Sequence, residues 1–284
     1  MPSLLDFRRR IRSVKSTQQI TKAMKMVAAA RLRRAQERVI AARPYAAILR
    51  EMLGNVASAA LTNEAVAGHP LLAERPETRI QLVLVTSDRG LAGAFNANLI
   101  RAAQRFIAEH PDAAVEIEAV GRKGRDFFRR RMGLSGEHIG IFQKALYSDA
   151  AAIAQKVAGR YRDAEVDAVY LIGNEFKSVV AQKLSVSRVL PVALPQQAGA
   201  DYLYEQPAEV LLESLLPRYI EIMIYQAILE SAAAEHAARM TAMDAASTNA
   251  ADVIDKLTLH MNRVRQASIT REIIEVVSGA TALE

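Results

Sequence analysis

Two stretches with a heptad spacing of apolar residues decide the fold of this chain. The first begins at Leu4 and reads LLDFRRRIRSVKSTQQITKAMKMVAAARLRRAQERVIAARPYAAILREMLGNV up to Val56. Alternating steps of three and four residues from Leu4 visit sixteen positions, and thirteen of them are apolar. The exceptions are Gln18, Thr21 and Lys25. This spacing is typical of the narrow seam of a coiled coil rather than the wider stripe of a surface helix.

The C-terminal part of the chain carries the same pattern. From Leu212 to Val264, the same steps again visit sixteen positions, of which thirteen are apolar. Beyond Val264 the pattern slips by one residue, which changes a supercoil locally. In the first stretch, Pro44 is expected to kink or break the helix, because proline lacks a backbone N–H. The sequence thus predicts two long helices that pair along their seams.

Between these helices the sequence alternates between strand and helix patterns. The run Ile80–Thr86 (IQLVLVT) is continuously apolar and β-branched, as in a buried parallel strand. Similar reasoning predicts strands at 115–120 and 166–172, helices at 94–109, 122–132 and 148–162, and one or two further strands within 176–194. Strands that alternate with helices indicate βαβ units and a mostly parallel sheet.

The predicted fold class is α/β, with a long antiparallel two-helix coiled coil formed by the N- and C-terminal helices and an inserted Rossmann-like α/β domain. The predicted division is an N-terminal coiled-coil helix at 1–57, the α/β domain at 78–197 and a C-terminal coiled-coil helix at 208–284. The last helix should extend ~20 residues, or ~30 Å, beyond its partner. A broad apolar arc on this extension consists of Ile269, Ile273, Ile274, Val276 and Val277. Such a helix must be buried, which predicts a partner with a hydrophobic socket.

Composition and charge exclude several classes of protein. The 284 residues contain no cysteine, which excludes a disulfide scaffold, a thiolate metal site and a cysteine nucleophile. No uncharged apolar run reaches the ~18 residues of a membrane span. Residues 1–50 carry thirteen basic and two acidic side chains, whereas 205–284 carry six basic and twelve acidic ones. These opposite charges attract each other if the two ends lie side by side.

Motifs of catalysis and cofactor binding are absent or incomplete. The segment Ser87–Gly93 (SDRGLAG) follows a strand where a Rossmann fold binds phosphate, but its glycine spacing matches neither nucleotide fingerprint. We interpret it as a tight strand-to-helix turn. The five histidines have no metal-ligand spacing. Glu116 and Glu118 alternate along a strand, which is more typical of a solvent-facing pattern than of acid–base chemistry. No cofactor or metal site is expected.

The basic N-terminal helix leaves three hypotheses open: it binds nucleic acid phosphates, an anionic membrane or acidic surfaces of protein partners. The lack of interleaved aromatics argues against nucleic acid, and the seam, already used by the partner helix, argues against flat membrane adsorption. The polar seam positions near Ile20–Val27 either set the register or mark a contact with a third body. In the second case Met24, Lys25 and Met26 form the contact, because methionine suits re-packing.

Four segments are similar to signature segments of the gamma subunit of F-type ATP synthase. They are Ile20–Arg31 (ITKAMKMVAAAR), Thr86–Asn96 (TSDRGLAGAFN), Ala238–Asn249 (ARMTAMDAASTN) and Arg265–Ala280 (RQASITREIIEVVSGA). They occur in family order and the resemblance covers essentially the whole chain. It implies the central rotor subunit of an F1Fo complex, which transmits torque between a proton-driven c ring and catalytic beta subunits and is not itself an enzyme. The alternative hypothesis is an α/β nucleotide- or nucleic-acid-binding module with helical arms.

The resemblance also implies contacts between this rotor and the surrounding beta subunits. Acidic beta loops would lie near Met24 and Lys25. Other beta loops would make polar contacts with Arg239, Arg265, Gln266 and Thr270. Lys25 stands where many relatives in that family carry an acid, which would change its pairing with beta.

The implied partners are the alpha and beta subunits, whose hexamer encloses the shaft, the epsilon subunit and the ring of c subunits. Tyr202 and Tyr204 resemble the foot region that faces the c ring and epsilon. The implied location is the cytoplasmic side of a bacterial inner (plasma) membrane, where the chain is held only through the complex. The lack of an obvious presequence favours a bacterial source. The cysteine insert of the chloroplast form is absent, so thiol control is not expected.

Overall fold

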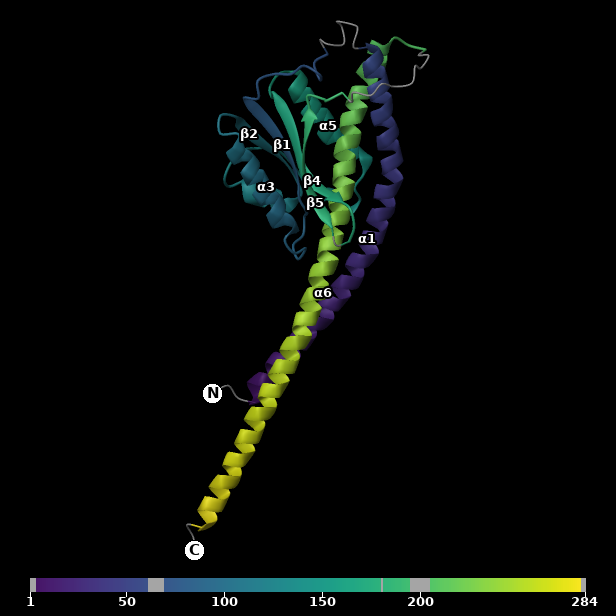
Figure 1. The fold of residues 1–284 in the computed structure, drawn as a ribbon. Coiled ribbons are helices and arrows are strands. Elements are labelled where there is room, and N and C mark those ends of the chain that lie inside the picture. The colour runs from purple at the N-terminus through teal and green to yellow at the C-terminus, as the bar shows by residue number, and fades with distance from the viewer. Residues whose placement is uncertain (1–3, 61–68, 180, 195–204, 282–284) are drawn as a thin grey trace. The chain divides into compact units, whose positions relative to one another are not determined.

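The computed structural model describes residues 4–60, 69–179, 181–194 and 205–281 (Figure 1). Two long helices, α1 (Leu4–Ala60) and α6 (Ala208–Thr281), enclose a region of strands and shorter helices in the sequence. The predicted break at Pro44 does not occur, because α1 runs through it. Pro44 is exposed, so water can replace the hydrogen bond that proline removes.

The chain forms two compact units, and each long helix contributes to both. The first unit consists of residues 1–28 and 240–284, and the second of residues 29–239. The division predicted from the sequence follows the change of secondary structure instead of these units, and it stays a prediction.

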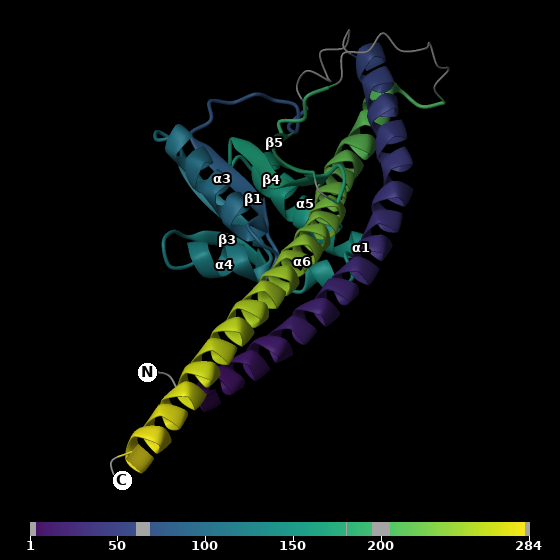
Figure 2. The ribbon, with the colours of Figure 1, turned by 60° about the horizontal axis from the view of Figure 1, so that its bottom comes forward.

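In the first unit, α1 and α6 run antiparallel and side by side (Figure 2). The rings of Phe7 and His260 lie 5.0 Å apart between centroids, whereas Lys25 pairs with Asp244, so residue numbers rise along one helix as they fall along the other. The buried side chains all lie on the predicted seam: Phe7, Thr21, Ala28, Met243, Ser247 and Ala250. The prediction of an antiparallel coil is confirmed in this unit.

The second unit contains a five-stranded sheet in the order β3-β2-β1-β4-β5. Its strands are β1 (Arg79–Val85), β2 (Ala114–Val120), β3 (Leu134–His138), β4 (Ala168–Phe176) and β5 (Gln182–Leu190). The first four are parallel and β5 is antiparallel to β4, so the prediction of a mostly parallel sheet is confirmed. The sequence did not predict β3, because its LSGEH stretch has no apolar run.

Shorter helices cover both faces of the sheet. The helix α3 (Phe95–Glu109) packs with α4 (Arg122–Phe128) on one face, in the apolar core that includes Ile117; Figure 2 labels both helices. The helix α5 (Tyr147–Arg162) lies on the opposite face. Its Lys156 donates a hydrogen bond to the carboxylate of Glu118, which follows Ile117 in β2 and therefore points to the other side of the sheet. The predicted helix at 122–132 ends earlier, at Phe128, because the chain turns there toward β3.

Within the second unit α6 buries a wider face than the predicted seam. The predicted positions Leu215, Tyr219, Ile222 and Gln226 are only half-buried. The seam residues Leu212, Leu229 and Ala233 are buried as predicted, but Leu216, Ile220, Ile224 and Ile228, which lie beside the seam, are buried as well. The reason is a second neighbour: the Ser231 hydroxyl accepts a hydrogen bond from the backbone N–H of Asn174 in β4, at 3.1 Å. The helix contacts α1 as well, where Arg43 lies 3.4 Å from Glu230.

Candidate functional site

The three polar seam positions of α1 all meet polar groups of α6. The hydroxyls of Thr21 and Ser247 are 2.7 Å apart, and both residues are buried. The amide of Gln18 donates to the backbone carbonyl of Ser247 at 3.4 Å, and the ammonium of Lys25 lies 2.6 Å from the carboxylate of Asp244. A sliding of one helix along the other would break all three contacts. This geometry supports the hypothesis that these residues set the register.

The pairing of Thr21 with Ser247 yields a double-mutant prediction. Thr21→Val leaves the buried Ser247 hydroxyl without its partner, which should lower the free energy of unfolding of the full chain by ~1–3 kcal/mol. Ser247→Ala should cost less, because the Thr21 hydroxyl keeps its hydrogen bond to the Gln18 carbonyl at 3.0 Å. The double variant should cost less than the sum of the two single variants, because no unpaired hydroxyl then remains. Urea unfolding followed by helical circular dichroism measures the three values. Thr248→Ala, at an exposed neighbouring position, is the control, and strict additivity would contradict the prediction.

Two of the predicted rotor–stator residues lie at this coil. Met24 and Lys25 are half-buried, whereas the neighbouring Met26 is 67% exposed. The ammonium of Lys25 is engaged by Asp244 within the chain, yet both side chains keep about half of their surface exposed. A contact of Met24 and Lys25 with a partner subunit stays a prediction.

Arg239, the third predicted contact residue, belongs to the second unit and is buried. Its guanidinium donates to the Glu235 carboxylate at 2.6 Å, to the Gly90 carbonyl at 3.1 Å and to Nδ1 of His236 at 3.4 Å. Burial, Arg239 and Arg31 together lower the pKa of His236 to about 4, so its imidazole is neutral near pH 7. The guanidinium of Arg239 therefore has partners inside this chain, and its contact with a beta loop stays a prediction.

The remaining shaft residues lie near the end of α6. Arg265, Gln266 and Thr270 are exposed, and the Thr270 hydroxyl donates to the Gln266 carbonyl at 2.9 Å. The guanidinium of Arg265 and the amide of Gln266 thus lie on the exposed surface of the helix. Contacts of these three residues with beta loops stay a prediction. The predicted foot residues Tyr202 and Tyr204 lie outside the described residues.

The end of α6 carries a large apolar surface that is exposed in the described part of the chain. The helix continues past His260, the partner of Phe7 near the start of α1, as Figure 2 shows. Its exposed apolar side chains are Ile269 (48%), Ile273 (58%), Ile274 (58%), Val276 (72%) and Val277 (58%). Isolated apolar residues on a surface need no explanation, but a contiguous group of this kind marks an interaction site. We call these five residues the apolar tip.

The segment Ser87–Gly93 forms a turn whose polar groups are bonded within the chain. The Ser87 hydroxyl donates to the carbonyl of Arg89 at 2.6 Å, and its backbone N–H donates to the side chain of Asn96. Leu91 adopts the left-handed region (φ 61°), as does Gly93 (φ 55°). These contacts support the interpretation as a strand-to-helix turn.

Glu118 corrects the interpretation of the acidic alternation on β2. Glu116 is exposed, as expected, but Glu118 is fully buried. Its carboxylate lies 2.8 Å from Lys156 and 2.6 Å from His138. Burial raises the pKa of Glu118, but hydrogen bonds from His138, Lys156 and Ser135 outweigh burial and lower it to about 2. The prediction of a solvent-facing pattern is wrong for Glu118, because Lys156 and His138 from two neighbouring segments cover it.

Other kinds of site were sought among the described residues. In these ranges no three His, Asp or Glu side chains lie close enough together to hold a metal ion. None of the described helices combines the length and the apolar character that a membrane crossing requires.

Sequence reasoning missed Asp244 and Glu235, which bind Lys25 and Arg239. A signal for Asp244 was present: it directly follows the seam residue Met243, and a charge beside a seam commonly pairs across a coil. Glu235 stands four residues before Arg239, the spacing of an ion pair on one helix face.

The whole chain matches a known family. The family model described as ATP synthase matches residues 3–283. An ATP synthase gamma chain from Solibacter usitatus is 64% identical over 286 residues, with 100% of both chains covered. The chain belongs to the ATP synthase gamma chain family. A second gamma chain, from Anaeromyxobacter, is 51% identical over 291 residues, again with 100% of both chains covered.

Solved structures share the gamma-chain fold. A chain from the central stalk and c ring of the Tetrahymena thermophila mitochondrial ATP synthase is 28% identical, with a TM-score of 0.64 and coverage of 80% of this chain and 99% of that chain. A chain from the Euglena gracilis mitochondrial ATP synthase is 18% identical, with a TM-score of 0.68 and coverage of 99% and 94%. The predicted fold class, two long paired helices around an α/β insert, is confirmed.

Proposed function

We propose that this gamma chain works as the central rotor shaft of a bacterial F1Fo ATP synthase and has no active site of its own. The apolar tip carries the proposal. Five Ile and Val side chains on the last turns of α6 keep about half or more of their surface exposed. An apolar sleeve formed by the alpha and beta subunits would bury them and allow them to turn, because apolar contacts have no fixed direction.

The shaft would act on the catalytic sites by shifting populations. Two helices side by side have an asymmetric cross-section, so three identical beta subunits around them meet different surfaces. A surface that fits one conformation of a beta subunit better than another changes the nucleotide affinity there. Rotation then passes each state from one beta subunit to the next, and the torque is exchanged with the proton-driven c ring at the foot.

The contacts that carry this torque are proposed at exposed and half-buried side chains of the shaft. Near the apolar tip they are Arg265, Gln266 and Thr270, and lower on the coil they are Met24 and Lys25. Arg239 takes part if a partner displaces one of its bonds within the chain. The epsilon subunit and the c ring are proposed to bind the foot, near Tyr202 and Tyr204. The complex would hold the chain at the cytoplasmic side of the bacterial inner membrane.

Rotation of the chain inside the hexamer is the deciding test. The chain contains no cysteine, so Arg105→Cys, on the exposed side of α3, gives a single attachment point for a gold or bead probe. With alpha and beta subunits of the same organism fixed to a surface, ATP should drive stepwise rotation in one direction. The cysteine-free chain is the control for non-specific attachment. ATP hydrolysis with a firmly attached probe that never rotates would overturn the proposal.

A further inference from the structure

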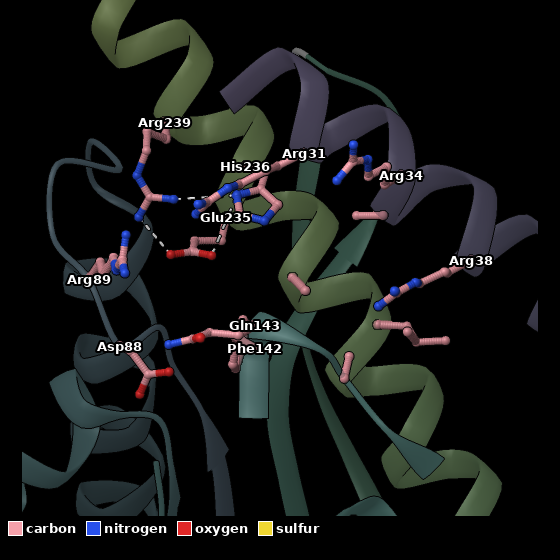
Figure 3. Close-up of a pocket in the computed structure, with 14 residues that line it drawn as sticks. Arg31, Arg34, Arg38, Asp88, Arg89, Phe142, Gln143, Glu235, His236 and Arg239 are labelled. Carbon is pink, nitrogen blue, oxygen red and sulfur yellow. Dashed lines mark hydrogen bonds and ion pairs between the residues drawn. The ribbon is translucent and has the colours of Figure 1, made fainter. Parts of the chain in front are cut away.

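A cavity of about 330 Å³ in the second unit is lined by an excess of arginines (Figure 3). Its walls come from α1, from the turn after β1, from the short helix η1 (Ile141–Gln143) with its flanking residue, and from α6. The basic lining side chains are Arg31, Arg34, Arg38, Arg89 and Arg239, and the acidic ones are Asp88 and Glu235. Five guanidinium groups thus surround the space with two carboxylates.

Both carboxylates are already bonded. The Asp88 side chain accepts hydrogen bonds from the backbone N–H groups of Arg122 and Gly140, each at 3.0 Å. The Glu235 carboxylate lies 2.6 Å from Arg239. Asp88 keeps its negative charge, because backbone N–H groups are neutral, but among the described residues neither acid forms an ion pair with an arginine of α1 or of the turn.

Four of the five arginines have no carboxylate partner. Among the residues that the structure describes, no carboxylate lies within ion-pair distance of Arg31, Arg34, Arg38 or Arg89. Figure 3 shows Arg31 extending from α1 over His236, and Arg89 in the neighbourhood of Arg239. Like charges held near one another repel unless an anion lies between them.

We propose that this cavity binds inorganic phosphate. A guanidinium group donates two parallel hydrogen bonds to a tetrahedral oxyanion, and groups from α1 and from the turn surround the space on different sides. His236 fits the same ligand, because its Nδ1 accepts from Arg239 and its proton is therefore on Nε2, which can donate to an anion. An acidic side chain of another subunit offers similar chemistry, but walls from four segments favour a small ligand.

The binding test compares two sets of arginines on the same helix. Isothermal titration calorimetry of the full chain with inorganic phosphate, at low and constant chloride, should show one saturable site. The double variant Arg31→Gln/Arg34→Gln removes two cavity arginines whose side chains are exposed, and it should bind at least tenfold more weakly. The control is Arg33→Gln, which lies on the same turn but outside the cavity lining and should bind like the original chain.

The histidine signals give a second readout. Without phosphate the pKa of His236 is about 4, lowered by burial and by Arg239 and Arg31. The other charged groups that line the cavity are Glu235 on its own helix, Arg34 and Arg38 on α1, and Asp88 and Arg89 on the turn. Bound phosphate offsets the two cations, so proton NMR should show the His236 titration at higher pH, while the other histidines stay unchanged. The variant His236→Asn identifies its signal.

Several outcomes would overturn the proposal: no saturable heat with phosphate, equal weakening by Arg33→Gln, or an unchanged His236 titration. Binding of a glutamate-rich peptide in the absence of phosphate binding would overturn it too, in favour of a protein partner. The rotation experiment does not depend on this cavity, so failure of one proposal is distinguishable from failure of the other.

Discussion

A chain that ends at Val264 should fail to assemble into a coupled ATP synthase. The truncation removes the whole apolar tip and leaves the described contacts of the coil in place, since these end at His260. Burial of an exposed Ile or Val contributes ~1 kcal/mol or more, so five of them amount to roughly 5 kcal/mol, which is a thousandfold or larger change in affinity. Assembly with alpha and beta subunits, followed by gel filtration and ATPase activity, measures the loss.

Point substitutions separate the apolar contact from the length of the helix. Ile273→Asp/Val276→Asp places two charges in the proposed sleeve and should reduce assembly at least tenfold, because burial of an unpaired charge is costly. The matched control, Ile273→Leu/Val276→Ile, keeps both positions apolar and should assemble normally. Circular dichroism checks that both variants keep their helix. If the truncated chain or the aspartate variant assembled and coupled as tightly as the original, the socket assigned to the tip would be wrong.

Replacement of Glu118 by glutamine should produce the largest loss of stability in the α/β part of the chain. The substitution removes a buried charge that lies against Lys156 and His138 and leaves the Lys156 ammonium without its carboxylate. Loss of one partner from a buried ion pair costs ~3–5 kcal/mol. The exposed neighbour Glu116, which lies 2.9 Å from Arg160, gives the control Glu116→Gln, with an expected cost of at most ~1 kcal/mol. Urea unfolding at pH 7 compares the two variants.

The same carboxylate predicts how stability depends on pH. The pKa of Glu118 falls from 4.5 to about 2 in the folded chain, so the unfolded chain binds a proton more readily. The stabilisation is therefore complete above pH 4.5 and is lost as pH falls from there toward 2. Its size is ~3 kcal/mol from the linkage of pKa to stability. Glu118→Gln should remove this part of the acid sensitivity, and an unchanged pH profile would show that Glu118 is not its source.

The periodic parts of the fold could be predicted from the sequence. The heptad spacing around Phe7 and Ala28 needs only one neighbour, and both residues are buried where α1 meets α6. The strand at Ile80–Thr86 could also be predicted, because a short, mostly apolar run rich in β-branched residues favours a buried strand over a helix. Where α6 has a second neighbour, at Ser231, the same spacing predicted only part of the buried face: Leu229 and Ala233 are buried, but a helix between two partners buries a wider arc.

The polar contacts were less accessible to sequence reasoning. Thr21 was placed on the seam, but its partner depends on the exact stagger of two helices more than two hundred residues apart in the chain. Glu118 reads as a surface acid because alternation along a strand says nothing about the cations that a later helix brings. The cavity arginines were seen as a basic helix face, and only folding adds Arg89 and Arg239 to them.

The hydroxyl pair of Thr21 with Ser247 and the ion pair of Lys25 with Asp244 have a mechanical consequence. Two helices that meet only through apolar side chains can respond to a torque by sliding along each other, and the work is then dissipated as heat. Because these polar contacts oppose sliding, the torque instead twists and bends both helices together. This narrow segment should therefore behave as a torsional spring, which stores elastic work during one part of a cycle and returns it in the next.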